Sequence, residues 1–334
     1  MAIPGWTQSQ SPFHEGELAI QAKLGVQERI DQQARRMIRT TLIPQHREFF
    51  AQLAYITVGT LDSKGRPWAS LLVGDPGFLS TPDERTLRVS ISPLAGDPLV
   101  NNLAEGKDIG FLGIELNTRR RNRLNGKVKA IGEDGFEVQV QQSFGNCPQY
   151  IQARSVVDSA STDSHPKNQT DSSTNSNGSE PNLVQTIEIF SEADRALIST
   201  ADTFFIATAY QDSKAGLASG VDVSHRGGKP GFVRVEENVL TVPDFSGNHH
   251  FNTFGNIALN PRAGLLFISF ETGDLLYLTG TAEVIWEGPE VSAYEGAERL
   301  LRFRLDVGYR VADSLALRWS LPEFSPYLER TGVW

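Results

Sequence analysis

Short runs of β-branched and aromatic residues alternate with turn-forming clusters across residues 202–286. The clusters DSKAG, SHRGGKPG, EEN and ETGD contain the glycine, proline and polar residues that favour turns. The expected strands are Phe204–Thr208, Gly231–Val235, Val239–Val242, Gly264–Phe270 and Leu275–Trp286. A short helix is expected over His249–Leu259, because the proline that follows Asn260 disfavours continued helix. Closely spaced strands with few exposed edges predict a small antiparallel barrel.

The first half of the chain repeats this pattern with a period of about 150 residues, which indicates a duplicated domain. Ala69-Ser70 resembles Ala218-Ser219, and each pair is followed by a Pro-Gly-Phe turn. Between these two features the second copy has ten residues and the first copy has five. The sequence therefore predicts that the first copy lacks the basic, glycine-rich SHRGGK segment.

Outside the two copies, the pattern predicts helices and a linker. Residues 12–40 place apolar side chains at helical spacing, with Gly25 interrupting the run. Residues 155–182 are rich in Ser, Thr, Asn and Asp, which predicts a disordered segment. Ser191 with Asp194 three residues later predicts a capped helix start. The expected organisation is an N-terminal helical segment (1–46), a first barrel (47–154), a linker (155–186) and a second barrel (187–334).

Four segments of the second copy, SHRGGKPGFVRV, VPDFSGNHHFNTFGNI, NPRAGLLF and LTGTAEVI, resemble the flavin-nucleotide-binding relatives of pyridoxamine 5'-phosphate oxidase. The resemblance covers residues 202–286 in matching order and spacing. It implies a mainly β fold with flanking helices, built as tandem FMN-binding split β-barrels of antiparallel, Greek-key type. It also implies FMN as the cofactor, bound mainly by the second copy. In this family the site lies at a barrel dimer interface, which a homodimer or the two copies of one chain would supply.

The chemistry of FMN indicates which residues would bind it. Arg226 can hold phosphate oxygens through two hydrogen bonds. The free N–H groups at the start of the expected helix form a second anion site. Where the family usually has Arg or Lys, this chain has His249. The expected cofactor-binding residues are Ser224, His225, Arg226, Lys229, Val242, Pro243, Asp244, Asn248, His249 and Thr279. The alternatives are a solvated hairpin tip for SHRGGK and an ordinary polar helix face for the histidines.

A basic row is expected in the first copy, in the sequence TRRRNRLNGKVK, because alternate residues of a strand share a face. This row would contact the cofactor phosphate across a barrel–barrel interface or bind an anionic substrate; the alternative is a solvated edge strand. Its members are Arg119, Arg121, Arg123, Lys127 and Lys129. The first copy has Asp75 and Asp97 where the second has its basic turn and helix start. Only the second copy is therefore expected to bind FMN.

The implied function is that of an FMN-dependent oxidoreductase, which transfers hydride between FMN and a nicotinamide such as NAD(P)H or another small molecule. No catalytic residue and no metal site are identified, and Cys147 is expected to be a packed apolar residue. One alternative is a non-catalytic flavin or haem carrier, with His225, His249 or His250 as iron ligands. Another is a deazaflavin-dependent reductase on the same fold.

Composition narrows the expected partners and location. The net charge of −9 disfavours nucleic acid and anionic membranes as partners. No apolar run has the length of a membrane span, and the N-terminal residues lack the pattern of a secretory signal. A single cysteine excludes an intrachain disulfide, as is usual in a reducing compartment. A cytoplasmic protein is therefore expected.

Overall fold

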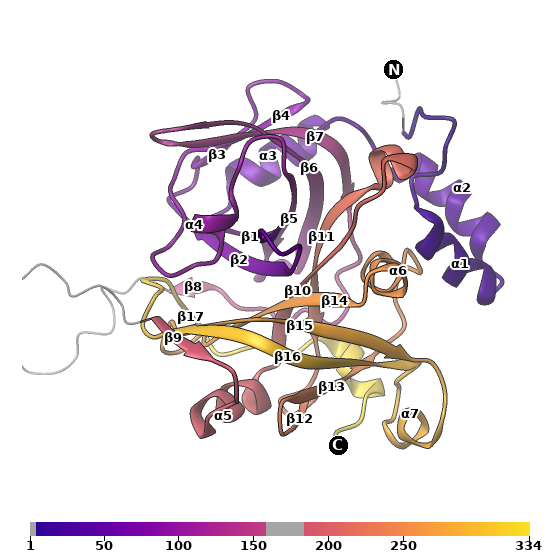
Figure 1. The fold of residues 1–334 in the computed structure, drawn as a ribbon, viewed down its shortest axis with the longest axis vertical. Coiled ribbons are helices and arrows are strands. Elements are labelled where there is room, and N and C mark those ends of the chain that lie inside the picture. The colour runs from indigo at the N-terminus through magenta and orange to yellow at the C-terminus, as the bar shows by residue number, and fades with distance from the viewer. Residues whose placement is uncertain (1–4, 158–183) are drawn as a thin grey trace, which may run out of the picture.

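The computed structural model describes residues 5–157 and 184–334. Two antiparallel sheets of the same construction, each curled into a split barrel, make up most of the molecule (Figure 1). The first sheet has seven strands in the order β2-β1-β5-β6-β7-β4-β3. The second follows the order β11-β10-β14-β15-β16-β13-β12, and β9 pairs with β16 beside this path. Strand for strand the two orders are equivalent, which confirms the tandem split-barrel architecture.

Of the four helices described in the first half of the chain, three precede the barrel and the fourth lies between two of its strands. The helices are α1 (Glu15–Lys23), α2 (Gln27–Met37), α3 (Pro44–Ala51) and α4 (Leu99–Asn102). The strands are β1 (Tyr55–Leu61), β2 (Pro67–Val73), β3 (Leu79–Ser80), β4 (Thr86–Val89), β5 (Asp108–Glu115), β6 (Arg120–Gly132), β7 (Gly135–Gly145) and β8 (Val156–Val157). Gly25 separates α1 from α2 with a φ of 68°, as the sequence predicts.

The second half follows the same plan. Its helices are α5 (Glu192–Thr200), α6 (Asn252–Leu259) and α7 (Pro289–Ala293), with 3-10 turns over Ser213–Ala218 and Pro326–Arg330. The strands are β9 (Val184–Ile187), β10 (Thr203–Tyr210), β11 (Gly220–Gly227), β12 (Arg234–Glu236), β13 (Val239–Asp244), β14 (Arg262–Ile268), β15 (Leu275–Ile285), β16 (Arg299–Val311) and β17 (Arg318–Trp319). Within the described residues, no helix is long and apolar enough to cross a membrane.

The ends of the predicted linker are ordered strands. β8 pairs with β17, and β9 pairs with β16, so backbone hydrogen bonds hold these ends, and Ile187 of β9 is also buried in the core of the second barrel. Residues 158–183, the remainder of the predicted linker, lie outside the described residues. The predicted capping box of α5 is confirmed, since the Ser191 hydroxyl accepts from the Asp194 N–H and the Asp194 carboxylate accepts from the Ser191 N–H.

Strand β11 is the main element that the sequence did not predict. It includes the SHRG residues that were assigned to a turn, and it pairs with β10 along its whole length. Val221, Val223 and His225 alternate as buried residues, so the strand period was present in the sequence. The glycines that follow obscured it, because a glycine-rich cluster is also the usual sign of a loop.

The hydrogen-bond ladders also correct the alignment of the two copies. The two sheets can be aligned by their backbone pairing alone, without using the sequence repeat. Gly110 pairs with Gly59 in the first sheet, and Gly264 pairs with Ala207 at the equivalent place in the second. When this alignment is extended to the neighbouring strands β2 and β11, Ser70 is equivalent to Ser224. The sequence comparison had matched Ser70 with Ser219 instead. The first copy therefore has a segment at this place, SLLVGD at 70–75, although it lacks the basic residues of SHRGGK at 224–229. The extra length of the second copy lies in the loop before β11.

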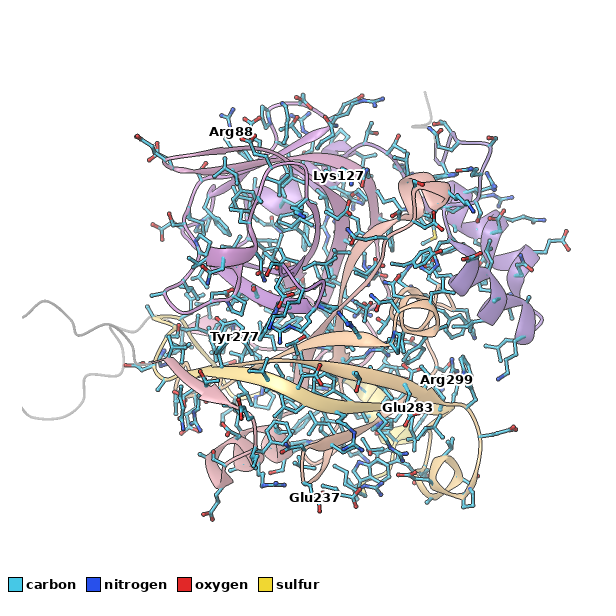
Figure 2. The ribbon with its side chains drawn as sticks, viewed as in Figure 1. Arg88, Lys127, Glu237, Tyr277, Glu283 and Arg299 are labelled. Atoms are coloured by element: carbon cyan, nitrogen blue, oxygen red, sulfur yellow. The ribbon has the colours of Figure 1, made fainter. Side chains whose placement is uncertain are left out.

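The two barrels pack against each other through an apolar core of their own, to which β1, β2, β10, β11, β14 and β15 contribute. A Cβ atom at Gly110 would lie 2.3 Å from the Val221 carbonyl oxygen, and one at Gly264 would lie 2.3 Å from the Pro67 carbonyl oxygen. In the ladders Gly110 is equivalent to Gly264, and Val221 to Pro67, so these two contacts are related by a pseudo-two-fold axis. Figure 2 labels Tyr277 of β15, which belongs to this shared core.

Gly110→Ala should destabilise the protein, because a methyl group cannot fit against the Val221 carbonyl. Overpacking of this kind typically costs about 1–3 kcal/mol. Gly132→Ala is the matched control, since the nearest atom to its new Cβ would be 3.9 Å away. Urea unfolding would measure both variants, and equal midpoints would contradict a close barrel–barrel contact at Gly110.

Candidate functional site

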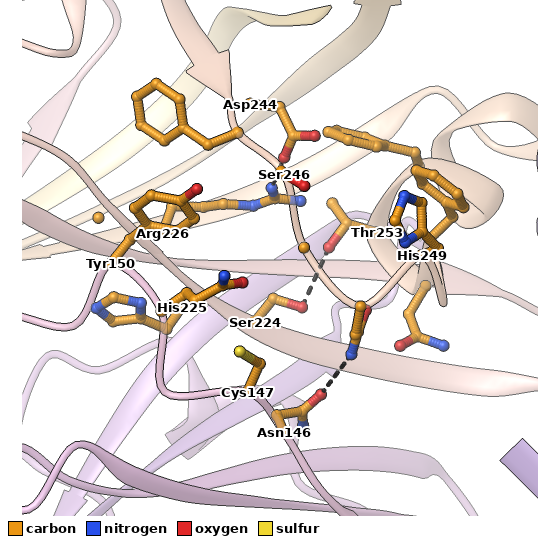
Figure 3. A pocket seen from close by; sticks show the side chains of 18 of the residues that line it. Asn146, Cys147, Tyr150, Ser224, His225, Arg226, Asp244, Ser246, His249 and Thr253 are labelled. Atoms are coloured by element: carbon orange, nitrogen blue, oxygen red, sulfur yellow. Dashed lines mark hydrogen bonds and ion pairs between the residues drawn. The ribbon is translucent and has the colours of Figure 1, made fainter. Parts of the chain in front are cut away.

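A pocket of about 140 Å³ lies where the barrels meet, and its volume is about 960 Å³ when the adjoining open solvent is included. Its walls come from β6 and the segment after β7 in the first barrel, and from β11, β13 and the start of α6 in the second (Figure 3). The pocket brings together most of the residues that the sequence singled out. These are Arg121, Arg123, Ser224, His225, Arg226, Pro243, Asp244, Asn248 and His249.

Four predicted site residues do not line this pocket. Arg119 lies in the turn before β6, where its guanidinium binds the Ile151 carbonyl and the Glu323 carboxylate. Lys229 donates to the carbonyl of Thr331 in the C-terminal segment. Val242 and Thr279 are buried: Val242 packs in the core of the second barrel, and the Thr279 hydroxyl lies 3.5 Å from the Ala263 carbonyl oxygen. All four are used in holding the fold together.

The predicted basic row is paired rather than free. Arg123 forms an ion pair with Asp222, at 2.7 Å, and Lys127 and Lys129 pair with Asp108 and Glu137. Register shifts after Asn125 and Val128 also interrupt the row. Arg121 forms no ion pair with any described residue, and it donates to the Cys147 carbonyl at 2.7 Å. Burial lowers the pKa of Arg121 to about 10, so it is still a cation at neutral pH. The row thus contributes two guanidinium groups to the pocket.

Arg226 and His225 are neighbours on β11, and only Arg226 is ion-paired. Arg226 pairs with the Asp244 carboxylate, and its guanidinium lies 4.8 Å from the centre of the Phe254 ring. Burial raises the pKa of Asp244, although Arg226 and Arg299 oppose that effect. His225 is 6% exposed, and its Nε2 atom has no partner among the described residues. Burial lowers its pKa well below the usual value, and Arg121 and Arg226 add to the effect, so the ring is neutral.

The start of α6 forms the opposite wall. The helix begins at Asn252, three residues later than predicted, because His249 and Phe251 adopt left-handed conformations with φ of 59° and 62°. Its end before Asn260-Pro261 is as predicted. The first N–H groups of a helix have no partner within the helix, and here they border the pocket. The Thr253 hydroxyl lies at this end and donates to the Ser224 hydroxyl at 3.1 Å.

Sequence reasoning did not identify the segment after β7 as part of the site. Asn146, Cys147 and Tyr150 line the pocket from the first barrel. Tyr150 has a φ of 61°, and a Cβ atom at Gly227 would lie 2.0 Å from its carbonyl oxygen. The segment therefore crosses β11 in close contact, and Gly227 permits the crossing. The only indication in the sequence is the string FGNCPQYI at residues 144–151, because a tyrosine in the left-handed conformation cannot be predicted from sequence.

The donors in this pocket suit an anion. Arg121, Arg123 and Arg226 supply positive charge, and the nitrogens His225 Nε2, Arg123 Nε and Arg226 Nε are buried without partners among the described residues. A buried polar group without a partner costs free energy, so an anionic ligand that accepts hydrogen bonds would be stabilised here. The pocket volume of about 140 Å³ is below the roughly 300 Å³ typical of small-molecule sites, so the pocket would take only one end of such a ligand.

The equivalent place in the first copy is closed. The ladders make Leu71 and Leu72 equivalent to His225 and Arg226, and Tyr277 equivalent to Arg123. The Asp97 carboxylate fills this place, accepting from the N–H groups of Leu71 at 3.2 Å and Leu99 at 2.7 Å. The hydroxyls of Ser70 and Tyr277 face it without a well-formed hydrogen bond. Apolar side chains and an acid thus replace the donors of the second copy.

Asp97 should make stability depend on pH, because burial raises its pKa to about 6. A carboxyl group whose pKa is higher in the folded state contributes stability below its unfolded pKa of about 3.9, and loses it as the pH rises to about 6. Two pKa units correspond to about 3 kcal/mol. Between about pH 4 and pH 7, the unfolding free energy of the parent should therefore fall relative to that of Asp97→Asn. Parallel pH profiles from denaturant titrations would rule out a buried, titrating Asp97.

Comparisons with known proteins identify a family for the first barrel. The family model for pyridoxamine 5'-phosphate oxidase matches residues 42–164, whereas the motifs that suggested this family lie in the second copy. Among curated proteins, none matches the sequence significantly.

Several solved structures are similar to part of the chain. HupZ from Group A Streptococcus is 16% identical over 35% of this chain and 91% of its own, with a TM-score of 0.28. A FAD-binding protein from Mesorhizobium loti is 15% identical over 38% of this chain and 97% of its own, with a TM-score of 0.25. General Stress Protein 26 from Bacillus anthracis is 14% identical over 39% of this chain and 93% of its own, with a TM-score of 0.24.

Proposed function

The first barrel of this chain matches the family model for pyridoxamine 5'-phosphate oxidase, and from that premise we propose that the chain belongs to this family and binds one FMN in the pocket between its two barrels. The observation that carries the proposal is the set of unpartnered donors on residues that line the pocket. A phosphate dianion accepts several hydrogen bonds and favours arginine as a partner. The same pocket contains residues of both copies, so one chain supplies the two halves of the site.

The phosphate end of FMN is assigned to the side of the pocket that the arginines line. Arg121 and Arg123 from the first barrel and Ser224 and Arg226 from the second surround it, and the first N–H groups of α6 point the helix dipole toward it. Asp244 compensates the charge of Arg226, which leaves Arg121 as the cation without an acidic partner among the described residues. Arg121 therefore contributes to affinity together with Arg226.

The flavin ring is assigned to the side of the pocket beside β13 and Tyr150. The β13 backbone at Pro243 and Asp244 borders this part, and Tyr150 and Phe245 lie there with ring centres 5.0 Å apart. Aromatic rings of this kind pack well against a flat ligand. Bound FMN would supply reversible two-electron chemistry, accepting hydride from a nicotinamide or another small molecule. The protein's contribution is to bind the phosphate, orient the ring and leave one face open to the electron donor.

One observation favours a second candidate, a haem carrier. His225 lines the pocket, and its neutral ring has an unpartnered Nε2 atom. A neutral histidine is the form that ligates iron. Its neighbours Arg121 and Arg226 oppose this reading, because their charges favour a phosphate over an iron cation. The visible spectrum of the purified protein separates the two, since a flavin and a haem absorb differently.

Arg226→Ala should weaken FMN binding by roughly 1.5–3 kcal/mol, the loss expected for charge-assisted hydrogen bonds. The remaining Asp244 carboxylate would add repulsion toward the phosphate. Titration of apo-protein followed by flavin fluorescence measures the change. Arg302→Ala is the control, because Arg302 is also ion-paired but lies outside the pocket. Unchanged affinity in Arg226→Ala would refute the assignment of Arg226.

Arg121→Gln should weaken FMN binding by about tenfold and make it less sensitive to salt, since it removes the unpaired guanidinium. Arg120→Gln is the matched control: the neighbouring side chain points to the other face, where it lies over the Phe49 ring. Dissociation constants at several salt concentrations would test this. Identical salt dependence in the parent and in Arg121→Gln would show that Arg121 does not contact the phosphate.

A further inference from the structure

Helix α1 crosses α6 in direct backbone contact. A Cβ atom at Gly16 would lie 2.3 Å from the Gly255 carbonyl oxygen, and one at Gly255 would lie 2.5 Å from Glu17 Cγ. Two glycines at the crossing thus bring the backbones together. Because α6 begins at the pocket, this contact connects the N-terminal segment to the candidate site.

Two buried side chains of α1 hold the turn that leads into α6. Glu17 is 3% exposed, and its carboxylate accepts from the His14 N–H at 2.8 Å and from the Asn252 side-chain amide. Gln21 is fully buried and donates to the His250 carbonyl at 3.2 Å. Asn252 lines the pocket, and His250 stands between the two left-handed residues of the turn. Left-handed conformations of such residues cost free energy and persist where the surroundings enforce them.

A second connection runs from α1 through the protein interior. His14 Nδ1 accepts from the Gly16 N–H, so its Nε2–H donates to the Asn256 side-chain oxygen at 2.9 Å. The Asn256 amide donates to Asp222 at 2.8 Å, and Asp222 accepts from Arg123 at 2.7 Å. Arg123 then donates to the Ser224 hydroxyl at 2.5 Å. An unbroken chain of hydrogen bonds therefore joins His14 to two pocket residues from different barrels.

We propose that α1 is a clamp for the anion-binding end of the pocket, with His14, Glu17 and Gln21 as positioning residues. This inference rests on the proposed FMN function, because it assigns the clamp to the phosphate rather than to the ring. Glu17 and Gln21 fix residues 248–252 in the conformation that presents the α6 N–H groups. His14 fixes, through Asn256 and Asp222, the orientation of Arg123 toward Ser224. Groups that orient the direct contacts of a ligand in this way commonly decide its affinity.

Glu17→Gln tests the clamp, because it keeps the size of the side chain and replaces one acceptor oxygen by an N–H₂ group. That group would face either the His14 N–H or the Asn252 amide, so one of these hydrogen bonds is lost. FMN and riboflavin, which lacks the phosphate, are titrated separately with the full-length protein. We expect affinity for FMN to fall about tenfold and affinity for riboflavin to change by less than about twofold. Glu28→Gln, the same change at an exposed position of α2, should alter neither affinity.

Gln21→Met provides a second variant in case Glu17→Gln does not fold. Gln21 Oε1 has no partner among the described residues, so methionine is tolerated there while the donor to His250 is removed. A selective loss of FMN affinity in either variant supports the clamp. Equal loss of affinity for both ligands, or an unchanged preference for FMN, contradicts it and leaves α1 a purely structural element. A parent protein that binds neither flavin contradicts the proposed function itself.

Discussion

The close approach of the two barrels is the constraint on which the candidate site depends. At Gly110 and Gly264 no Cβ atom could be accommodated against the carbonyl of the opposite barrel. This contact lets β6 of the first barrel lie beside β11 of the second, so that Arg123 reaches both Asp222 and Ser224. The ion pair is buried and joins the copies through charge as well as through the apolar core. Neither barrel alone contains the whole pocket.

The pseudo-two-fold arrangement creates two equivalent places, and the side chains make them unequal. One place has arginines, an unpartnered histidine nitrogen and a helix of eight residues. The other has leucines, the Tyr277 ring and the Asp97 carboxylate, beside a helix of four residues. A phosphate would be attracted at the first place and repelled at the second, since a like charge at close range costs roughly 1 kcal/mol or more. Divergence of charge between the two copies would therefore give one anion site per chain.

Much of the fold was predictable from the sequence, because β-branched periodicity and repeated turns report directly on strands. The pocket was predictable in part: Ser224, Arg226 and Arg121 were identified, although β11 was read as a turn. The alignment of the copies failed at Ser70, because sequence similarity in the loops outweighed the strand register, which only backbone pairing reveals. Tyr150 and the role of α1 could not be predicted, since left-handed residues and contacts between distant segments leave no local pattern.

Native mass spectrometry of the purified full-length protein tests the central claim most directly, because it identifies the bound ligand and counts it per chain. If one pocket is built from both barrels, the spectrum should show a single FMN per chain, and release of the ligand should return the mass of the apo-protein. Two FMN molecules per chain, or a haem or deazaflavin in their place, would contradict a single FMN site between the barrels.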